Sequence, residues 1–335
     1  MSSGHPQRSS ANAHRLSGLR SRAAKGRLAT LVAIVACGSL GGARLHGESV
    51  TFYFAPPANT AYQAKKVEIT EIRIGANREE LTLGTLETLR LRQEAGTFYI
   101  ASRIDRIAAA KEGKAIAVPP AVDALLGSEI VRIFRLDGVL QRITGYERMA
   151  AKALQSMTGE TRRSFERFMA EGRQDDRDQA AWFEVETLLG QTLELDRDYW
   201  FEAAWPDESG WITHHTLVRL GPWVDQPSGR LLTVHLAYVA NAAAAVPGAT
   251  HLVPKVLSRF NARQPGTLGP KLKLEGASTW LMDPATAVVW RLQSRRKVSE
   301  PIQVSEELGV TLVTEEKIDL TLEPLAAPAA APAKP

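Results

Sequence analysis

The stretch that decides the fold runs from Gly145 to Gly190, GYERMAAKALQSMTGETRRSFERFMAEGRQDDRDQAAWFEVETLLG. Its apolar residues recur at steps of three and four, the spacing of one face of an amphipathic helix. Gly159 and Gly172 interrupt the pattern, and acidic residues open its last part, where a helix start favours negative charge. The stretch therefore predicts three short helices. Helices this short are marginal alone in water, so we expect them to lie on an apolar surface, and a sheet is the candidate.

On both sides of the helical stretch the apolar residues alternate with period two, as in the strands of a half-buried sheet. Before it, the runs LTL, LETLRLR and TFYIASRI are separated by Gly84 and Gly96, which predicts an antiparallel meander. In KKVEITEIRI the apolar phase changes half-way along. This change predicts a bulge or a switch of buried face near Thr70.

Two turn signals predict hairpins. Asp137-Gly138, between EIVRIFRL and VLQRI, is typical of a two-residue turn in which both residues have positive φ angles. Asp283-Pro284 suits the first positions of a type I turn between two further strands.

Together these patterns predict an α+β, β-rich fold with one or more curved antiparallel sheets and a central helical segment packed on one face. The predicted parts are an export signal and linker (1–47), a single β-rich domain (48–323) and a disordered tail rich in Pro and Ala (324–335). An alternative divides the domain into two lobes, 48–144 and 191–323, joined by the helices of 145–190.

The N-terminal region predicts export. Residues 1–27 hold six basic residues and no acid, and the apolar run LATLVAIVACGSLGGA that follows is too short for a stable membrane span. Loss of six positive charges with the signal would take the formal net charge from +4 to −2. Net charge therefore gives no support to a nucleic-acid partner, and we expect none.

Cys37 is the only cysteine and a candidate lipidation site. It follows Ile34-Val35-Ala36, which resembles the lipobox of bacterial lipoproteins and implies a membrane tether through Cys37. The alternative is that Cys37 lies inside an ordinary signal that is cleaved after Ala43. Both alternatives predict an exported protein, either periplasmic or a membrane-anchored lipoprotein, whose mature chain has no disulfide.

The motifs that suggest catalysis or metal binding have simpler explanations. Ser278 in GASTW lacks the final glycine of a nucleophile elbow and lies in strand-like sequence, so we expect an ordinary strand residue. His214 and His215 are adjacent on a strand and point to opposite faces, so both cannot bind one ion. His215 and His235 share a phase and could approach each other, but no carboxylate cluster accompanies them. We therefore assign no catalytic, cofactor-binding or metal-binding residue.

The acidic clusters also have structural explanations. Asp175, Asp176 and Asp178 lie at a predicted helix start, which needs no bound cation to explain them. The pairs Glu306-Glu307 and Glu315-Glu316 lie on strand-like sequence, where neighbouring side chains diverge, so we expect them to face solvent.

The order of these parts resembles a family of uncharacterised bacterial envelope proteins over residues 50–323. The resemblance rests on LLG followed by the DG hairpin, the helical segment, a strand near Tyr199-Trp200, and the pattern Gly-x-Ser-x-Trp followed by Asp-Pro-x-Thr-x-x-x-Trp. The family usually has Gly-Asp-x-Trp where this chain has DRDYW, which weakens the match there. At the level of fold, the layout is similar to the periplasmic lipoprotein-carrier fold, a curved antiparallel sheet whose concave face is covered by helices and can hold acyl chains.

The resemblance implies a binding role and no reaction. It predicts an exported, non-enzymatic envelope protein that binds an apolar ligand, such as a lipid acyl chain, between sheet and helices. The alternative is a structural or protein-partner-binding envelope protein with no ligand cavity. An enzyme is disfavoured because no convergent set of titratable groups is visible in the sequence.

Overall fold

The computed structural model describes residues 48–118, 120–123, 125–170, 173–207, 210–227, 229–239, 242–253, 273–303 and 309–325. Before the helical stretch, the strands are β1 (Ser49–Thr51), β2 (Thr60–Ile74), β3 (Asn77–Glu94), β4 (Thr97–Lys111), β5 (Lys114–Ile116), β6 (Glu129–Arg135) and β7 (Leu140–Thr144). After it, they are β8 (Thr192–Glu194), β9 (Asp198–Asp207), β10 (Gly210–Gln226), β11 (Gly229–Val239), β12 (Thr250–His251), β13 (Lys273–Asp283), β14 (Val288–Gln303) and β15 (Gly309–Pro324). The helices are α2 (Pro120–Asp123), α3 (Tyr146–Gln155), α4 (Gly159–Ala170), α5 (Arg173–Leu188) and α6 (Ala242–Ala245).

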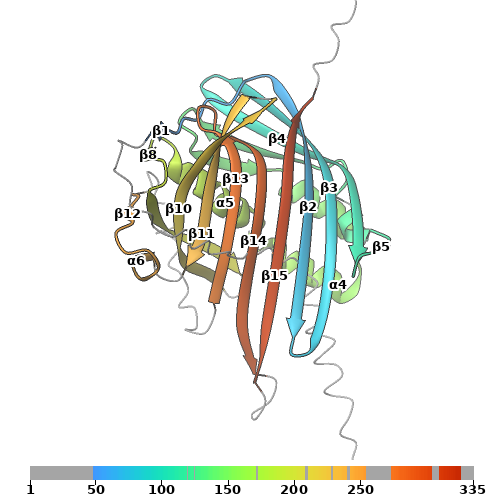
Figure 1. Ribbon diagram of the computed structural model, residues 1–335. Helices are drawn as coiled ribbons and strands as arrows, with labels where there is room; N and C mark the ends of the chain where they lie inside the picture. The colour runs from blue at the N-terminus through green and yellow to red at the C-terminus, as the bar shows by residue number, and fades with distance from the viewer. Residues whose placement is uncertain are drawn as a thin grey trace, which may run out of the picture.

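One sheet of 13 strands dominates the molecule, in the order β12-β9-β10-β11-β13-β14-β15-β2-β3-β4-β6-β7, with β5 paired to β4. Its neighbours are antiparallel except for β12 and β9, and the long strands bend along their length (Figure 1). A separate two-stranded sheet joins β1 to β8. The prediction of a β-rich fold with a large antiparallel sheet is confirmed. Because β15 pairs with β2, strands from both sides of the helical stretch belong to the same sheet.

The meander β2-β3-β4 is present, but its strands are longer than predicted. β3 runs unbroken from Asn77 to Glu94, so the prediction that Gly84 separates two strands is wrong. Gly84 stays extended within β3 and pairs with Val67 and Ala108 on the neighbouring strands. The last strand, β15, includes Pro324, which pairs with Tyr62, so the first residue assigned to the tail belongs to the sheet. Residues 1–47 and 326–335 lie outside the described part of the chain.

The three helices predicted for the central stretch are α3, α4 and α5. Gly145 precedes α3 with φ of 107°, and a Cβ there would lie 2.2 Å from the carbonyl oxygen of Glu129, so the position requires glycine. Figure 1 shows α4 and α5 behind the sheet in a view in which β2, β14 and β15 lie in front. In the described part of the chain, no helix is long and apolar enough to cross a membrane.

Two buried apolar clusters lie on the side of the sheet that contacts α5. In the first, Val185 and Leu188 of α5 pack with residues of β9, β10, β11 and β13, and Phe183 meets Phe201 edge-on at 6.0 Å. The second cluster joins β2, β4, β6 and β7 to Tyr146 of α3. Trp182 packs against both clusters. We call this side of the sheet the inner face and the opposite side the outer face.

The apolar phase of β2 changes sides without a bulge. The pairing of β2 with β15 and with β3 is continuous from Thr60 to Ile74, so of the two predicted alternatives, a bulge or a switch of buried face near Thr70, there is no bulge. The apolar residues do change sides, but Val67 on the outer face is 45% exposed. Lys66 and Glu68 lie on the inner face with Tyr62, whereas Val67 lies on the outer face.

The first hairpin has a longer turn than predicted. β6 ends at Arg135 and β7 begins at Leu140, and only Gly138 of the Asp137-Gly138 pair has a positive φ, 84°. The Gly138 N–H donates to the Arg135 carbonyl at 3.0 Å, and the next pair in the ladder is shifted in register. Trp182 Nε1 donates to the Gly138 carbonyl at 2.9 Å, so the turn also holds α5. A type I turn followed by a left-handed glycine accounts for this geometry.

We predict that Gly138→Ala destabilises the protein more than Gly75→Ala. Both glycines have positive φ, so alanine costs about 1 kcal/mol at either position. At Gly138, a Cβ would also lie 2.3 Å from Leu189 Cδ1 and 2.9 Å from Phe54 Cβ, whereas at Gly75 it would meet nothing within 4 Å. We expect a loss of about 3 kcal/mol for Gly138→Ala in urea unfolding. Equal losses for the two variants would show that the turn does not pack against α5 as described.

Candidate functional site

A band of polar side chains crosses the inner face beside the two apolar clusters. The strand registers place its members on one side of the sheet, and α5 adds one carboxylate from above. We call this band the polar stripe; its residues are Glu184, Tyr238, Ser278, Ser294, Arg296, Glu316, Glu68, Lys66, Glu87, Ser102 and Arg132.

Glu184 and Arg296 meet at Tyr238 at one end of the polar stripe. The Tyr238 hydroxyl donates to Glu184 Oε2 at 3.1 Å, and Arg296 Nη2 donates to the Tyr238 oxygen at 3.4 Å. The Arg296 guanidinium lies over the ring of Trp205, 3.8 Å from its centroid, and 5.0 Å from the centroid of Tyr238. Gly276 pairs with both Tyr238 and Arg296, so no side chain stands between them in that row. These contacts hold a carboxylate and a guanidinium in the interior.

Two serines extend this network along β13 and β14. Ser278 Oγ lies 3.2 Å from the Tyr238 oxygen and 2.7 Å from Ser294 Oγ. The ring of His214 meets Tyr238 edge-on at 5.4 Å. Ser278 lies in a strand, as predicted, and is a buried member of the stripe.

Burial sets the proton affinity of this cluster. It raises the pKa of Glu184 to about 7, because the charged form loses its hydration, while Arg296 and the hydrogen bond from Tyr238 act in the opposite direction. Burial also raises the pKa of Tyr238 above its usual range, so the hydroxyl keeps its proton. Glu184 is therefore a buried acid that exchanges a proton near neutral pH.

The middle of the stripe is an ion pair. Lys66 Nζ lies 2.6 Å from Glu68 Oε2. Burial alone would lower the pKa of Lys66, but Glu68, Glu316 and Glu87 outweigh it and the pKa is raised. Lys66 therefore stays charged in the folded protein.

A third group joins the helices to β6. Arg132 Nη2 lies 2.5 Å from Asp178 Oδ2, and the Tyr146 hydroxyl donates to the same oxygen at 2.8 Å. Arg132 Nη1 also donates to Ser102 Oγ at 3.2 Å. The sequence predicted that Asp178 only provides a negative charge at the N-terminus of a helix. Its carboxylate instead connects α3, α5 and the sheet.

Some buried polar groups of the inner face have no hydrogen-bond partner among the described residues. They are Arg296 Nε and the hydroxyls of Thr216 and Thr314. These side chains are 7%, 0% and 1% exposed, respectively. Buried donors without protein partners are rare in folded proteins, and an ordered water or ion is one common partner.

The predicted divergence of His214 and His215 is confirmed. His214 is buried on the inner face, whereas His215 stacks on Trp200 at 4.7 Å, and Trp200 stacks on His251 at 4.2 Å. His215 does not approach His235, because His215 pairs with Val239 near the far end of β11. Within the described ranges, no group of three or more His, Cys, Asp or Glu could hold a metal ion. Cys37 and Glu306-Glu307 lie outside those ranges.

The prediction that Glu315 and Glu316 face solvent is wrong. Glu316 is 1% exposed on the inner face, and Glu315 is 5% exposed on the outer face. Glu315 is covered by Arg295 at 2.8 Å and Lys317 at 3.3 Å. Burial would raise the pKa of Glu315, but these cations lower it overall. A signal was present in the sequence, since Glu316 interrupts the buried phase of its strand.

Beside the polar stripe, the inner face carries apolar residues that belong to neither core cluster. Ile72, Leu81 and Leu83 are half-buried, and the strand registers bring them together with three buried residues of β13, β14 and β15. We call this surface the inner apolar patch; it consists of Ile72, Leu81, Leu83, Leu274, Val298 and Leu312.

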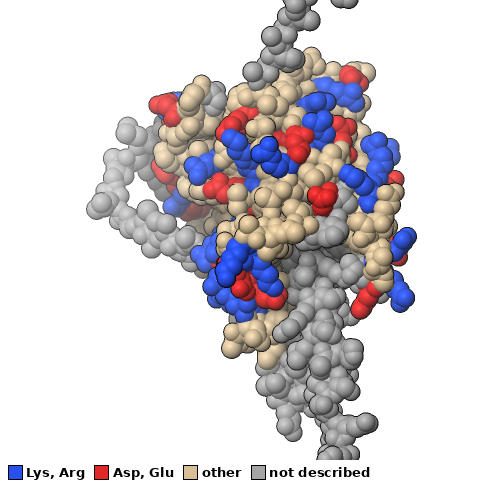
Figure 2. Space-filling view, turned by 90° about the vertical axis from the view of Figure 1, so that its right-hand side faces the viewer, with Lys and Arg blue, Asp and Glu red and all other residues tan. Residues whose placement is uncertain are grey.

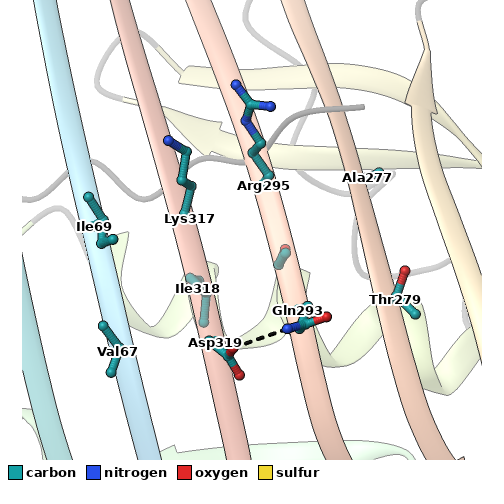
Figure 3. Close-up of a pocket in the computed structure, with 10 residues that line it drawn as sticks. Val67, Ile69, Ala277, Thr279, Gln293, Arg295, Lys317, Ile318 and Asp319 are labelled. Atoms are coloured by element: carbon teal, nitrogen blue, oxygen red, sulfur yellow. Dashed lines mark hydrogen bonds between the residues drawn. The ribbon is translucent and has the colours of Figure 1, made fainter. Parts of the chain in front are cut away.

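The outer face has a hollow of about 370 Å³ on β2, β13, β14 and β15. Figure 3 shows its side chains on the side of the strands away from the helices, with Val67 and Ile69 on β2, and Arg295 and Lys317 beside them. Val67 is 45% exposed, and Asp319 accepts a hydrogen bond from Gln293 at 3.1 Å. The hollow is apolar in its floor and charged at its rim.

Acidic and basic side chains alternate over the surface that Figure 2 draws. Ion pairs of this kind join Lys111 to Glu79 at 3.2 Å and Arg103 to Asp105 at 2.7 Å on β3 and β4. Exposed pairs such as these add little to stability. The described part of this surface therefore presents mixed charge.

No family model and no curated protein matches the chain. Among solved structures, a beta-barrel-like DUF1849 protein from Brucella abortus is 8% identical, with 81% of this chain and 100% of that chain covered and a TM-score of 0.19. A DUF1329 family protein from Desulfovibrio piger is 9% identical, with 81% and 88% covered and a TM-score of 0.19. An outer membrane channel from Pseudomonas putida is 8% identical, with 81% and 97% covered and a TM-score of 0.17. Likenesses at this level carry no argument about ligand or location, so the resemblance to envelope proteins stays a prediction.

We predict that Glu184→Gln removes a pH dependence of stability. The pKa of Glu184 is about 7 in the folded protein and 4.5 in the reference state, so the folded state keeps a proton that the unfolded state loses. Stability from this group is present below pH 4.5 and is lost as pH rises through 7, by about 3 kcal/mol. Unfolding by urea at pH 5 and pH 8 should show this loss for the wild type and not for Glu184→Gln.

The control is Glu194→Gln, which removes a half-exposed carboxylate paired with Arg197. Its profile should match the wild type. A Glu184→Gln profile parallel to the wild type would mean that Glu184 is not a buried acid.

Proposed function

We propose that this chain is an exported, non-enzymatic envelope protein that holds a lipid acyl chain on the inner apolar patch, between the sheet and its helices. The observation that carries the proposal is the patch itself, six apolar side chains on the helix side of the sheet that belong to neither core cluster. An acyl chain laid on such a surface would remove apolar area from water at about 25 cal/mol per Å².

The polar stripe supports this proposal because it borders the patch. Thr314, two residues before Glu316 on the same face of β15, pairs with Ile72 and Val298 of the patch. Small-molecule sites combine a mostly apolar lining with a few buried polar groups that fix orientation. A ligand with an apolar acyl chain and a polar head group would match a site that is apolar over most of its surface and polar at one border.

The helices supply the cover in this proposal. Asp178 and Glu184 attach α5 to Arg132 and Tyr238 of the sheet, at two points along the helix. We propose that α3, α4 and α5 lie over the bound chain and shield it from water.

The outer hollow favours the alternative, a protein-partner-binding role. Its floor exposes Val67 and Ile69 on the face opposite the helices, beside the charged rim. Apolar surface rimmed by polar groups is typical of protein contact sites.

We predict that Leu83→Trp lowers uptake of a fluorescent fatty-acyl probe by about tenfold or more, because the indole fills the inner patch. Ile69→Trp is the matched control, since Ile69 of β2 is half-buried like Leu83 of β3 but lines the outer hollow. Purified, delipidated protein would be titrated with the probe, and thermal unfolding would confirm that both variants fold.

The reverse result, with uptake lost only in Ile69→Trp, would place the ligand in the outer hollow. Absence of probe uptake by the wild type, together with absence of lipid in mass spectra of protein from its host, would overturn the acyl-binding proposal in favour of the partner-binding one.

We also propose that the protein is tethered to a membrane through Cys37. An acylated cysteine anchors firmly, since each buried methylene contributes about 0.8 kcal/mol. Cys37→Ser should release the protein from the membrane fraction or block its processing, as followed by fractionation and gel mobility. If the variant behaves as the wild type and the mature N-terminus maps beyond Ala43, the protein is exported without a lipid.

A further inference from the structure

Exposed apolar side chains gather at one end of the large sheet. Six large apolar side chains are exposed in the described part of the chain, and three of them lie at the end where β2 and β4 begin. We call these three the end patch; they are Tyr53, Leu136 and Leu325. The other three lie elsewhere: Val67 in the outer hollow, Ile116 on β5 and Val253 after β12.

The strand registers place Leu136 and Leu325 at the same end. Leu136 directly follows β6, whose last residue pairs with the first residue of β4. Leu325 directly follows β15, and its N–H donates to the Ala61 carbonyl at 2.9 Å, near the start of β2. The starts of β2 and β4 both pair with the last residues of β3, so the two leucines lie at one end of the sheet. This end is at the top of Figure 1.

Tyr53 joins the end patch through its backbone and its neighbour Phe54. The Tyr53 N–H donates to the Pro284 carbonyl at 2.7 Å, in the turn before β14. Both β14 and β2 run antiparallel to β15, so both begin at this end. A Cβ at Gly138, in the turn that contains Leu136, would lie 2.9 Å from Phe54, so Phe54 packs against that turn. Tyr53 and Leu136 are both more than half exposed.

The chain from Cys37 reaches the fold at the same end. Glu48 accepts a hydrogen bond from Trp223 Nε1 at 2.9 Å. Trp223 pairs with Leu232, and Leu232 pairs with Met282, next to the last residue of β13. Cys37 precedes Glu48 by eleven residues, a length of chain that spans at most about 40 Å. A membrane that holds Cys37 is therefore within reach of the end patch.

The charged residues beside the end patch are paired. Arg135 and Asp137, on either side of Leu136, lie 2.7 Å apart. Lys65 Nζ lies 2.8 Å from the carboxylate of Glu323, two residues before Leu325. These pairs leave no excess positive charge to attract anionic lipid. Exposed tyrosine and leucine instead suit the boundary between lipid head groups and acyl chains.

We propose that the end patch contacts the membrane to which Cys37 tethers the protein, with Tyr53 and Leu136 inserted among the lipid head groups. The inference rests on the proposed tether. Three exposed side chains bind a membrane weakly by themselves, but a short tether makes the contact intramolecular and raises its effective concentration. β4 is 15 residues long, about 50 Å at the usual rise per residue, so Ile116, which pairs with its far end, stays away from the lipid.

The test uses mature protein from its host, reconstituted into phosphatidylcholine vesicles. Leu136→Cys and, as the control, Ile116→Cys each carry one fluorescent dye, because Cys37 is either acylated or removed in the mature chain and offers no competing thiol. Flotation first establishes that the protein is bound. Nitroxide-labelled lipid should then quench the dye at position 136 and leave the emission of the dye at position 116 unchanged.

A second substitution tests the side chains of the patch. Tyr53→Ser in the Leu136→Cys protein should reduce the quenching, because the ring beside the dye no longer enters the head groups. Val67→Ser is the matched control, since Val67 is exposed but lies in the outer hollow, and it should leave the quenching as it was. High salt should not reduce the quenching, because the contact is apolar.

Four outcomes would overturn the inference. Protein that does not float with the vesicles would overturn the tether and this inference with it. Protein that floats while the two dyes respond alike would leave the tether standing and remove the oriented contact. Quenching that needs anionic lipid and disappears in salt would show an electrostatic contact in place of an apolar one. Shielding of the dye at position 136 without vesicles, rising with protein concentration, would assign the end patch to a second copy of the chain.

Discussion

The burial of charged side chains on the inner face is the constraint on which the rest of this structure depends. A charge that leaves water costs several kcal/mol unless partners replace its hydration. The inner face meets this requirement with two half-buried ion pairs, Lys66 with Glu68 and Arg132 with Asp178, and with the buried Arg296 between aromatic rings. Two of these groups involve acids of α5, so the position of the helix over the sheet is fixed by specific partners as well as by apolar contact.

Much of the fold can be predicted from the spacing of apolar residues, because a helix or strand with one apolar side shows that side directly in its sequence. The three helices of the central stretch and the Asp283-Pro284 hairpin are of this kind. The predictions are wrong where contacts between residues far apart in the sequence determine the local backbone. Gly84 was taken for a break because glycine is common in turns, but two long neighbours hold it extended. Gly138 makes a longer turn than the sequence suggested because α5 packs directly on it.

The polar stripe could not be predicted, because its members come together only through strand pairing. Glu184, Tyr238 and Arg296 are each separated from the next by more than fifty residues along the chain, so no local pattern relates them. Thr314 and Glu316 did interrupt a buried phase, which was a local sign that their face is polar at that level. Nothing in the sequence showed that Glu316 pairs with Thr70 and that Glu68 and Lys66 come next on the same face of β2.

In the middle of β2, apolar packing does not explain why charged side chains face inward. Lys66 and Glu68 point inward while Val67 and Ile69 point outward, so a one-residue slip would bury the apolar pair and expose the charged one. Two residues near the start of the strand prevent this slip. Tyr62 packs edge-on against Trp290 at 5.6 Å, Ala64 is buried in the second cluster, and any slip would turn both outward. Tyr62 and Ala64 determine which alternate residues of β2 face inward. In the middle of the strand, the inward residues are therefore the charged ones and the outward residues are apolar. Since buried ion pairs seldom stabilise a fold more than apolar residues of similar size would, the inverted segment adds polarity to the interior that stability does not require.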